Sequence, residues 1–478
     1  MSLSDNVIKG MAWSMIGRIS AQGVQFIIGI ILARILSPEE YGTIGLLIVF
    51  IAFMQVFVDS GFGKALIQKQ DRTQIDLSTV FFFNIGISLI SYFLLWLSAP
   101  FIADFYGNIA LKNLLRVLSI SLFTSAMFSV HQTIFTIKLD FKTIAKINLI
   151  TTSLSGLIGV LLAYIGYGVW ALVFQILIKS IFSAILMWLY IDWKPMFFFS
   201  KSSIKSMFPY GSRLLLSSLL NMSVNNFSNL FIAKFTSIKN LGYYSRGTQF
   251  ADIIFTLFSS VLDSVLLPSL SKIQNERKRL VLLTKSTIKS AALISFPVLI
   301  GLAVVSQPLV KILLGDKWLM SVPIMQILCL ARLITIISVI NINVLYVIGR
   351  TDLALRQQYL KIIVRILLLV IALNFGILYV ALAELFSTMI HFFINTYYPG
   401  KILQYGPFQQ IKNLSKILFS SLVMAFGMYL SIYFLDGIHM KLIISLIISL
   451  PIYILFIKAF KVEEFTILLS KFKYLIRS

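Results

Sequence analysis

The sequence predicts an all-α polytopic membrane protein with fourteen transmembrane helices, arranged as two parallel-repeat six-helix lobes plus an extra C-terminal helix pair. Three observations predict this fold class. The 478 residues are 58% hydrophobic and 12% charged, whereas about a quarter of the residues of a soluble protein are charged. The apolar residues form runs of about 20–25 residues, the length that crosses a hydrocarbon core. Finally, the first half of the chain repeats in the second half.

Apolar runs separated by charge, glycine and proline define the predicted helices. The first lobe, 1–195, takes the runs 11–33, 41–62, 79–102, 114–137, 144–165 and 168–191. The second lobe, 196–405, takes 208–232, 243–270, 283–305, 322–347, 354–374 and 376–398. The extra pair, 406–460, takes 414–434 and 440–458. Residues 461–478 form a predicted cytoplasmic tail, either an amphipathic helix on the membrane surface or an ordinary solvated helix end.

The repeat is clearest after the first and seventh runs. Leu32–Gly42 and Ile232–Gly242 match at an offset of 200 residues, and Gly168 before the sixth run recurs as Gly376 before the twelfth. Six helices lie between the copies, so both copies have the same orientation. Two such lobes, related by an axis along the membrane normal, are typical of transporters.

Basic residues also set the expected orientation. With the N-terminus inside, the cytoplasmic segments hold 25 lysines and arginines, and the opposite loops hold 7. By the positive-inside rule we expect both termini in the cytoplasm. Most of the net charge of +23 then reflects membrane topology, and we expect no nucleic-acid partner.

The remaining basic residues lie within apolar runs or at their ends. They are Arg18, Arg116, Lys179, Arg213, Arg246, Lys289, Arg332, Lys361 and Arg365. The acids in such places are Asp59, Asp252, Asp263 and Glu384. A cation near the bilayer centre costs about 2.5–3.5 kcal/mol on insertion scales, so the cations near mid-span need a wet cavity or a partner.

Polar side chains beside these cations predict a substrate path, because they recur at helical spacing on one face of their helices. The predicted substrate-binding residues are Arg18, Gln22, Gln25, Arg213, Asn221, Asn225, Arg332, Lys361 and Arg365. A cation-rich cavity favours an anion, and diphosphate suits bidentate guanidinium contacts. Glu384 and Asp252 are the candidates for binding a coupling proton or sodium ion.

Structural explanations for the same residues stay open. Glu384 would form an ion pair with one or both of Arg332 and Arg365, and Lys179 would be satisfied inside the first lobe. Arg18 and Arg213 would extend to cytoplasmic lipid phosphates. The sequence shows no nucleophile–base pair, phosphate loop or metal-ligand spacing. It therefore predicts no catalytic residue, no metal and no cofactor.

Three segments, Leu32–Leu46, Asp59–Lys69 and Leu313–Trp318, resemble the Wzx-type flippases of the multidrug/oligosaccharidyl-lipid/polysaccharide (MOP) exporter superfamily. The resemblance implies a two-lobe fold with a central cavity and transport by alternating access. It implies an undecaprenyl-diphosphate-linked oligosaccharide as substrate, carried from the cytoplasmic to the outer leaflet of the inner membrane. Arg18 matches an arginine implicated in substrate binding in related flippases.

The resemblance also suggests partners. These are membrane lipids, a polysaccharide polymerase and chain-length proteins. The extra helix pair, 406–460, would form a groove for the lipid tail or would simply pack against lipid.

Two other functions compete. A drug or cation exporter of the same superfamily should show more intramembrane acids than cations. A membrane polysaccharide polymerase or ligase should have a large outer loop, whereas each predicted outer loop here is under about 20 residues.

Overall fold

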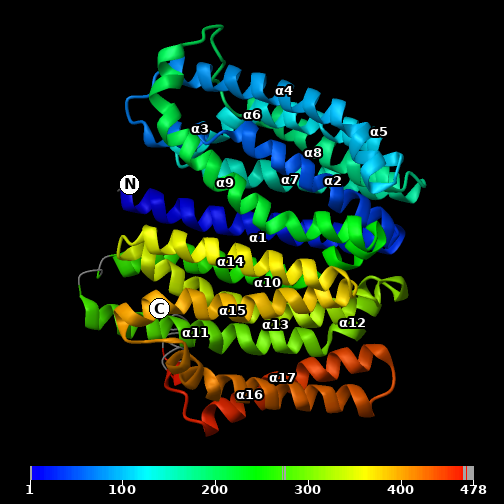
Figure 1. Cartoon of the computed structure of the whole chain (residues 1–478), viewed down its shortest axis with the longest axis vertical. Coiled ribbons are helices and arrows are strands. Elements are labelled where there is room, and N and C mark those ends of the chain that lie inside the picture. The colour runs from blue at the N-terminus through cyan, green and yellow to red at the C-terminus, as the bar shows by residue number, and fades with distance from the viewer. Residues whose placement is uncertain (1–2, 272, 274–275, 467–469, 471–478) are drawn as a thin grey trace. The chain divides into compact units, whose positions relative to one another are not determined.

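The computed structural model describes residues 3–271, 273, 276–466 and 470, except for the side chains of 3–12, 221, 224–225, 260–269, 271 and 351. The chain divides into two compact units, Met1–Gly242 and Tyr243–Ser478. Within each unit, long helices lie side by side (Figure 1). The described residues contain helices and their connections without a strand, which confirms the all-α prediction.

The first unit holds the helices α1 to α9 and the start of α10. They are α1 (Leu3–Ile35), α2 (Pro38–Asp59), α3 (Phe62–Gln68), α4 (Gln74–Tyr106), α5 (Ala110–Leu118), α6 (Ile120–Ile137), α7 (Phe141–Tyr164), α8 (Val169–Leu189) and α9 (Lys201–Phe235). The helix α9 packs on α2, α3 and α4, so its contacts group it with this unit. The contacts divide the chain after Gly242. The predicted lobe boundary at residue 195 stays a prediction.

The second unit holds most of α10 and the remaining helices. They are α10 (Ile238–Ser271), α11 (Arg277–Val304), α12 (Ser306–Leu313), the 3-10 helix η1 (Asp316–Trp318), α13 (Ser321–Val347), α14 (Thr351–Leu373), α15 (Ile377–Leu403), α16 (Pro407–Phe434) and α17 (Ile438–Ala459). The predicted tail, 461–478, lies mostly outside the described residues, which omit 467–469 and 471–478.

Each predicted apolar run coincides with one of these helices or with a pair of them. The run 114–137 is divided at Ser119 into α5 and α6. Among the described residues, 11 helical segments are long and apolar enough to cross a membrane. The other three predicted spans fall on α9, α10 and α14. The number fourteen therefore stays a prediction.

Equivalent positions of the sequence repeat adopt similar local structures. Ser37 precedes α2, and its hydroxyl accepts a hydrogen bond from the backbone N–H of Glu40 at 3.3 Å. Ser237 precedes α10 in the same way, accepting from the N–H of Asn240 at 3.0 Å. Such caps satisfy N–H groups that have no partner within the helix. The repeat thus extends to the way in which the two helices begin.

Close backbone contact explains why glycine occupies positions 42 and 242 of the repeat. A Cβ atom at Gly42 would clash with the backbone carbonyl of Ile238, and one at Gly242 would clash with the carbonyl of Pro38. All four residues belong to the first unit. Because the two backbones meet directly, neither position has room for a side chain.

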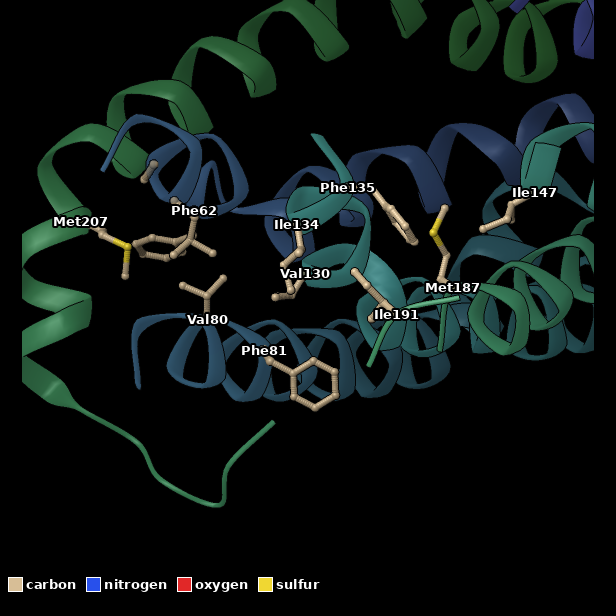
Figure 2. Close-up of a cluster of buried hydrophobic side chains, with 12 residues drawn as sticks. Phe62, Val80, Phe81, Val130, Ile134, Phe135, Ile147, Met187, Ile191 and Met207 are labelled. Carbon is tan, nitrogen blue, oxygen red and sulfur yellow. The ribbon is translucent and has the colours of Figure 1, made fainter. Parts of the chain in front are cut away.

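The segment Asp59–Lys69 builds part of the first unit's core. Ser60 and Gly61 take positive φ angles of 46° and 71°, which turn the chain from α2 into α3. Phe62 and Leu66 of α3 then enter the hydrophobic cluster drawn in Figure 2. The cluster comprises Phe62, Ala65, Leu66, Val80, Phe81, Val130, Ile134, Phe135, Ile147, Met187, Ile191 and Met207. The segment therefore has a packing role.

In the second unit, Trp318 ends the segment Leu313–Trp318. Its side chain is fully buried and meets the ring of Tyr243 edge to face, with 6.2 Å between ring centroids. This segment also has a packing role.

Buried hydrogen bonds attach the C-terminal helix pair to the rest of the second unit. The amide of Asn341 on α13 and the amide of Gln410 on α16 exchange hydrogen bonds of 3.0 and 2.8 Å. The hydroxyl of Tyr453 on α17 donates to the carbonyl of Leu293 on α11 at 2.7 Å. The pair is therefore packed as part of this unit along α11 and α13.

Candidate functional site

A cavity of about 670 Å³ lies within the first unit, between side chains of α1, α6, α7 and α8. Its lining residues are Ser14, Gly17, Arg18, Ala21, Gln22, Gln25, Gln132, Thr136, Phe141, Ile144, Ala145, Asn148, Thr152 and Lys179. Three of the predicted binding residues, Arg18, Gln22 and Gln25, thus line one cavity, as their spacing along a single helix face predicts.

Small residues fix α1 against α7 beside this cavity. Gly17 lies so close to Ala145 that an added Cβ would clash with the alanine side chain. Further along the same pair of helices, Ile28 occupies the space that a side chain at Gly156 would need. Close approach at these small residues sets the position of the polar face that carries Arg18.

The cavity is basic. Arg18 is exposed and Lys179 is half-buried, and no acidic residue stands among the described residues that line it. Neither cation has an ion pair or hydrogen bond within the described part of the chain. For a cation at mid-bilayer depth this costs about 2.5–3.5 kcal/mol unless water or a ligand compensates it. Among the residues that the structure describes, no contact supports the alternative that Lys179 is satisfied inside its lobe.

The second unit contains a different kind of charged cluster. Arg332 on α13 donates to Asp252 on α10 at 2.5 Å and to Glu384 on α15 at 2.7 Å. Arg365 on α14 lies 3.6 Å from the other oxygen of Glu384. The hydroxyl of Tyr244 also donates to that oxygen. Two guanidinium groups and two carboxylates therefore balance each other across four helices.

This geometry matches the structural alternative for Arg332 and Arg365. The side chain of Glu384 is 6% exposed, and its two oxygens contact Arg332, Arg365 and Tyr244. The side chain of Asp252 is 42% exposed and keeps one oxygen outside the ion pair. Roles for these four residues in substrate or ion binding stay predictions.

The other predicted residues are dispersed. Lys361 on α14 is half-buried, and its backbone carbonyl lies 3.0 Å from Nε2 of His391. Arg213 is exposed on α9 and does not belong to the lining of the cavity. The side chains of Asn221 and Asn225 lie outside the described residues.

Sequence reasoning missed the polar residues that α6 and α7 contribute to the cavity. They are Gln132 and Thr136 on α6, and Asn148 and Thr152 on α7. Each pair is four residues apart, so each pair shares a helix face. The four-residue spacing of polar side chains in apolar helices is the sequence signal that could have predicted these lining residues. What the spacing could not show is that both faces border the same cavity as the polar face of α1.

Comparisons with known proteins agree with this architecture. Residues 31–323 match the family described as polysaccharide biosynthesis protein. The chain is 29% identical over 468 residues to the teichuronic acid biosynthesis protein TuaB of Bacillus subtilis (strain 168), covering 96% of this chain and 97% of TuaB. It is 24% identical over 367 residues to the lipopolysaccharide biosynthesis protein WzxC of Escherichia coli (strain K12), covering 76% and 74%.

A solved structure shows the fold. The lipid II flippase MurJ in an inward closed conformation matches with a TM-score of 0.74 and 19% identity. The match covers 93% of this chain and 98% of MurJ. At this identity the match shows that the fold is shared.

Proposed function

The chain belongs to the polysaccharide biosynthesis protein family, and from that membership we propose that it flips an undecaprenyl-diphosphate-linked oligosaccharide across the bacterial inner membrane. The predicted resemblance to Wzx-type flippases of the MOP superfamily is confirmed. The proposal adds the substrate, the direction from the cytoplasmic to the outer leaflet, and alternating access. It also keeps both termini in the cytoplasm.

The observation that carries the proposal is the basic cavity of the first unit. Arg18 and Lys179 line it, and the described lining residues include no acid. A diphosphate is an anion whose oxygens accept charge-assisted hydrogen bonds from such groups. The amides of Gln22 and Gln25 add donors and acceptors on the same helix face.

In the proposed cycle, Arg18, Gln22 and Gln25 receive the diphosphate while the lipid tail stays in the bilayer. Lys361 is a further candidate contact, as are Arg213, Asn221 and Asn225 on α9. Arg332 and Arg365 both contact the carboxylate of Glu384. To bind a phosphate, each would have to give up that contact. Rocking of repeated lobes then exposes the head group to the other side.

A drug or cation exporter is the competing function. Such a transporter needs negative charge where an organic cation binds. The first unit's cavity offers positive charge, and the acids of the second unit's cluster are bound to arginines. The charges of the described residues therefore favour an anionic substrate.

Complementation of a strain that lacks its own flippase tests the proposal. The wild-type gene should restore surface glycan. Arg18→Ala should abolish it and cause the lipid-linked precursor to accumulate in the inner leaflet. Arg18→Lys should keep part of the activity, because it retains the charge but loses bidentate geometry. Normal glycan export by Arg18→Ala at equal protein abundance would contradict the assignment.

A further inference from the structure

Lys179 is a cation of the first unit's cavity to which the proposed cycle assigns no contact with the substrate. It lies on α8, half-buried, and lines the same cavity as Arg18. Two other lysines that lie against protein have carboxylate partners: Lys69 is 2.8 Å from Asp76, and Lys289 is 2.7 Å from Glu464. Within the described residues Lys179 has no such neighbour, although its side chain is half-buried.

Arg18 and Lys179 reach the cavity from different helices. Arg18 is on α1 and Lys179 is on α8, and the cavity between their helices is also bordered by α6 and α7. A guanidinium is suited to a bidentate contact with one phosphate, while an ammonium is a compact point charge with rotatable donors. A ligand with two linked phosphates offers one group to each.

Thr152 supplies an independent indication of a ligand. Its side chain lines the cavity and is 3% exposed, yet its hydroxyl has no hydrogen-bond partner within the described residues. Its neighbours Thr151 and Ser155 instead donate to carbonyls of their own helix at 3.3 Å. Because buried polar groups are normally paired, an unpaired hydroxyl beside a polar cavity indicates a missing partner.

The volume and composition of the cavity limit what fits. A volume of about 670 Å³ falls in the ordinary range of small-molecule sites, about 300–1,000 Å³. The amides of Gln132 and Asn148 lie on the α6 and α7 side. Amides and hydroxyls bind sugar hydroxyls, so this side suits the first sugar after the diphosphate.

We propose that Lys179 and Arg18 form a two-point phosphate clamp, in which Lys179 makes the site select a diphosphate over a monophosphate. Thr152, Asn148 and Gln132 then contact the sugar next to the diphosphate. The clamp is complete within the first unit. This inference rests on the proposed function and names the groups that recognise its substrate.

Binding to the purified full-length protein tests the clamp. The protein is placed in phosphatidylcholine nanodiscs and titrated with undecaprenyl diphosphate or undecaprenyl monophosphate, with dissociation constants read by native mass spectrometry. The variants are Lys179→Met, Lys179→Arg as the charge-retaining form, and Lys146→Met as the matched control. Lys146 is an exposed lysine on α7 outside the lining of the cavity.

Lys179→Met should weaken diphosphate binding about tenfold, or ~1.4 kcal/mol, and monophosphate binding by less than about threefold. Lys179→Arg should keep most of the selectivity, and Lys146→Met should bind both lipids as the wild type does. Equal diphosphate binding by wild type and Lys179→Met would overturn the clamp while leaving the proposed function intact. An equal loss of affinity for both lipids would show that Lys179 does not select the diphosphate over the monophosphate. Failure of the wild type to bind either lipid would overturn the proposed function as well.

Discussion

The two units of this protein place cations among apolar helices and treat them differently. In the first unit, Arg18 and Lys179 line a cavity whose described lining contains no carboxylate. In the second unit, Arg332 is held by Asp252 at 2.5 Å and by Glu384 at 2.7 Å. One arrangement leaves positive charge available for a ligand, whereas the other consumes it inside the protein.

The difference shows what decides the role of an intramembrane cation. Removal from water costs free energy in both units, and something must offset that cost. A carboxylate on a neighbouring helix offsets it permanently and joins the helices. Water or an anionic ligand offsets it only while the site is occupied or wet. The ion-paired arrangement of the second unit contributes to stability, and the cavity of the first unit contributes to binding.

Glu384→Gln should break the cluster of the second unit and have the largest effect on stability. Arg332 would keep Asp252, while Arg365 would lose its contact with the carboxylate of Glu384. Breaking a buried ion pair costs about 3–5 kcal/mol. The thermal unfolding midpoint of the detergent-solubilised protein should fall sharply. Glu463→Gln, at an exposed position, is the control. Adding Arg332→Met to Glu384→Gln should recover part of the loss, and an unchanged midpoint for Glu384→Gln would show that the cluster does not support the fold.

Gln410→Leu tests whether the polar interior of the second unit is satisfied generally. It would leave the amide oxygen of Asn341 without the donor that now lies 2.8 Å away. A buried unpaired polar group costs about 1–3 kcal/mol. The double variant Asn341→Leu/Gln410→Leu should be more stable than the single one in the same thermal assay. If the single variant melts like the wild type, the amide pair is not needed to attach α16.

Gly17→Ala tests the wall of the cavity in the first unit. The new methyl group would clash with Ala145, at an overpacking cost of about 1–3 kcal/mol. Gly23→Ala, on the same helix, has nothing within 4 Å and should stabilise the protein by about 0.5–1 kcal/mol through helix propensity. Opposite shifts of the unfolding midpoint are therefore expected. Equal shifts would mean that α1 is not fixed by its contact with α7.

Arg18→Gln should have the smallest effect on stability, within about 0.5 kcal/mol, because Arg18 is exposed and has no partner among the described residues. It should nevertheless abolish transport of a fluorescent lipid-linked diphosphate in proteoliposomes. Glu384→Gln is the opposite case, with a large loss of stability. A large destabilisation by Arg18→Gln would remove the contrast between the two units.

Much of the fold was predictable because it depends on local composition. The apolar runs coincide with helices, and the repeated serines at positions 37 and 237 cap helices at equivalent places. The break at Ser119, which divides one run into α5 and α6, was not predicted. The hydropathy pattern is continuous across this position and does not report such a break.

The candidate site was predictable only in part. The polar face of α1 could be read from the spacing of Arg18, Gln22 and Gln25, and these residues do line one cavity. Assigning Arg332 and Arg365 to substrate binding did not anticipate that both reach Glu384. The ion-pair alternative stood beside that assignment, but nothing in the sequence could choose between them.

The sequence by itself determined that this chain lies in a membrane, which segments are helical, and that its two halves repeat. These properties depend on the transfer of residues from water to lipid and on spacing along one helix. The tertiary structure alone decided which cations are neutralised. Asp252 and Glu384 are 80 and 52 residues away from Arg332 along the chain, and only the packing of α10, α13 and α15 brings their charges together. The cavity that Arg18 and Lys179 line has no acid among its described lining residues, because of the neighbours that α1 and α8 acquire on folding.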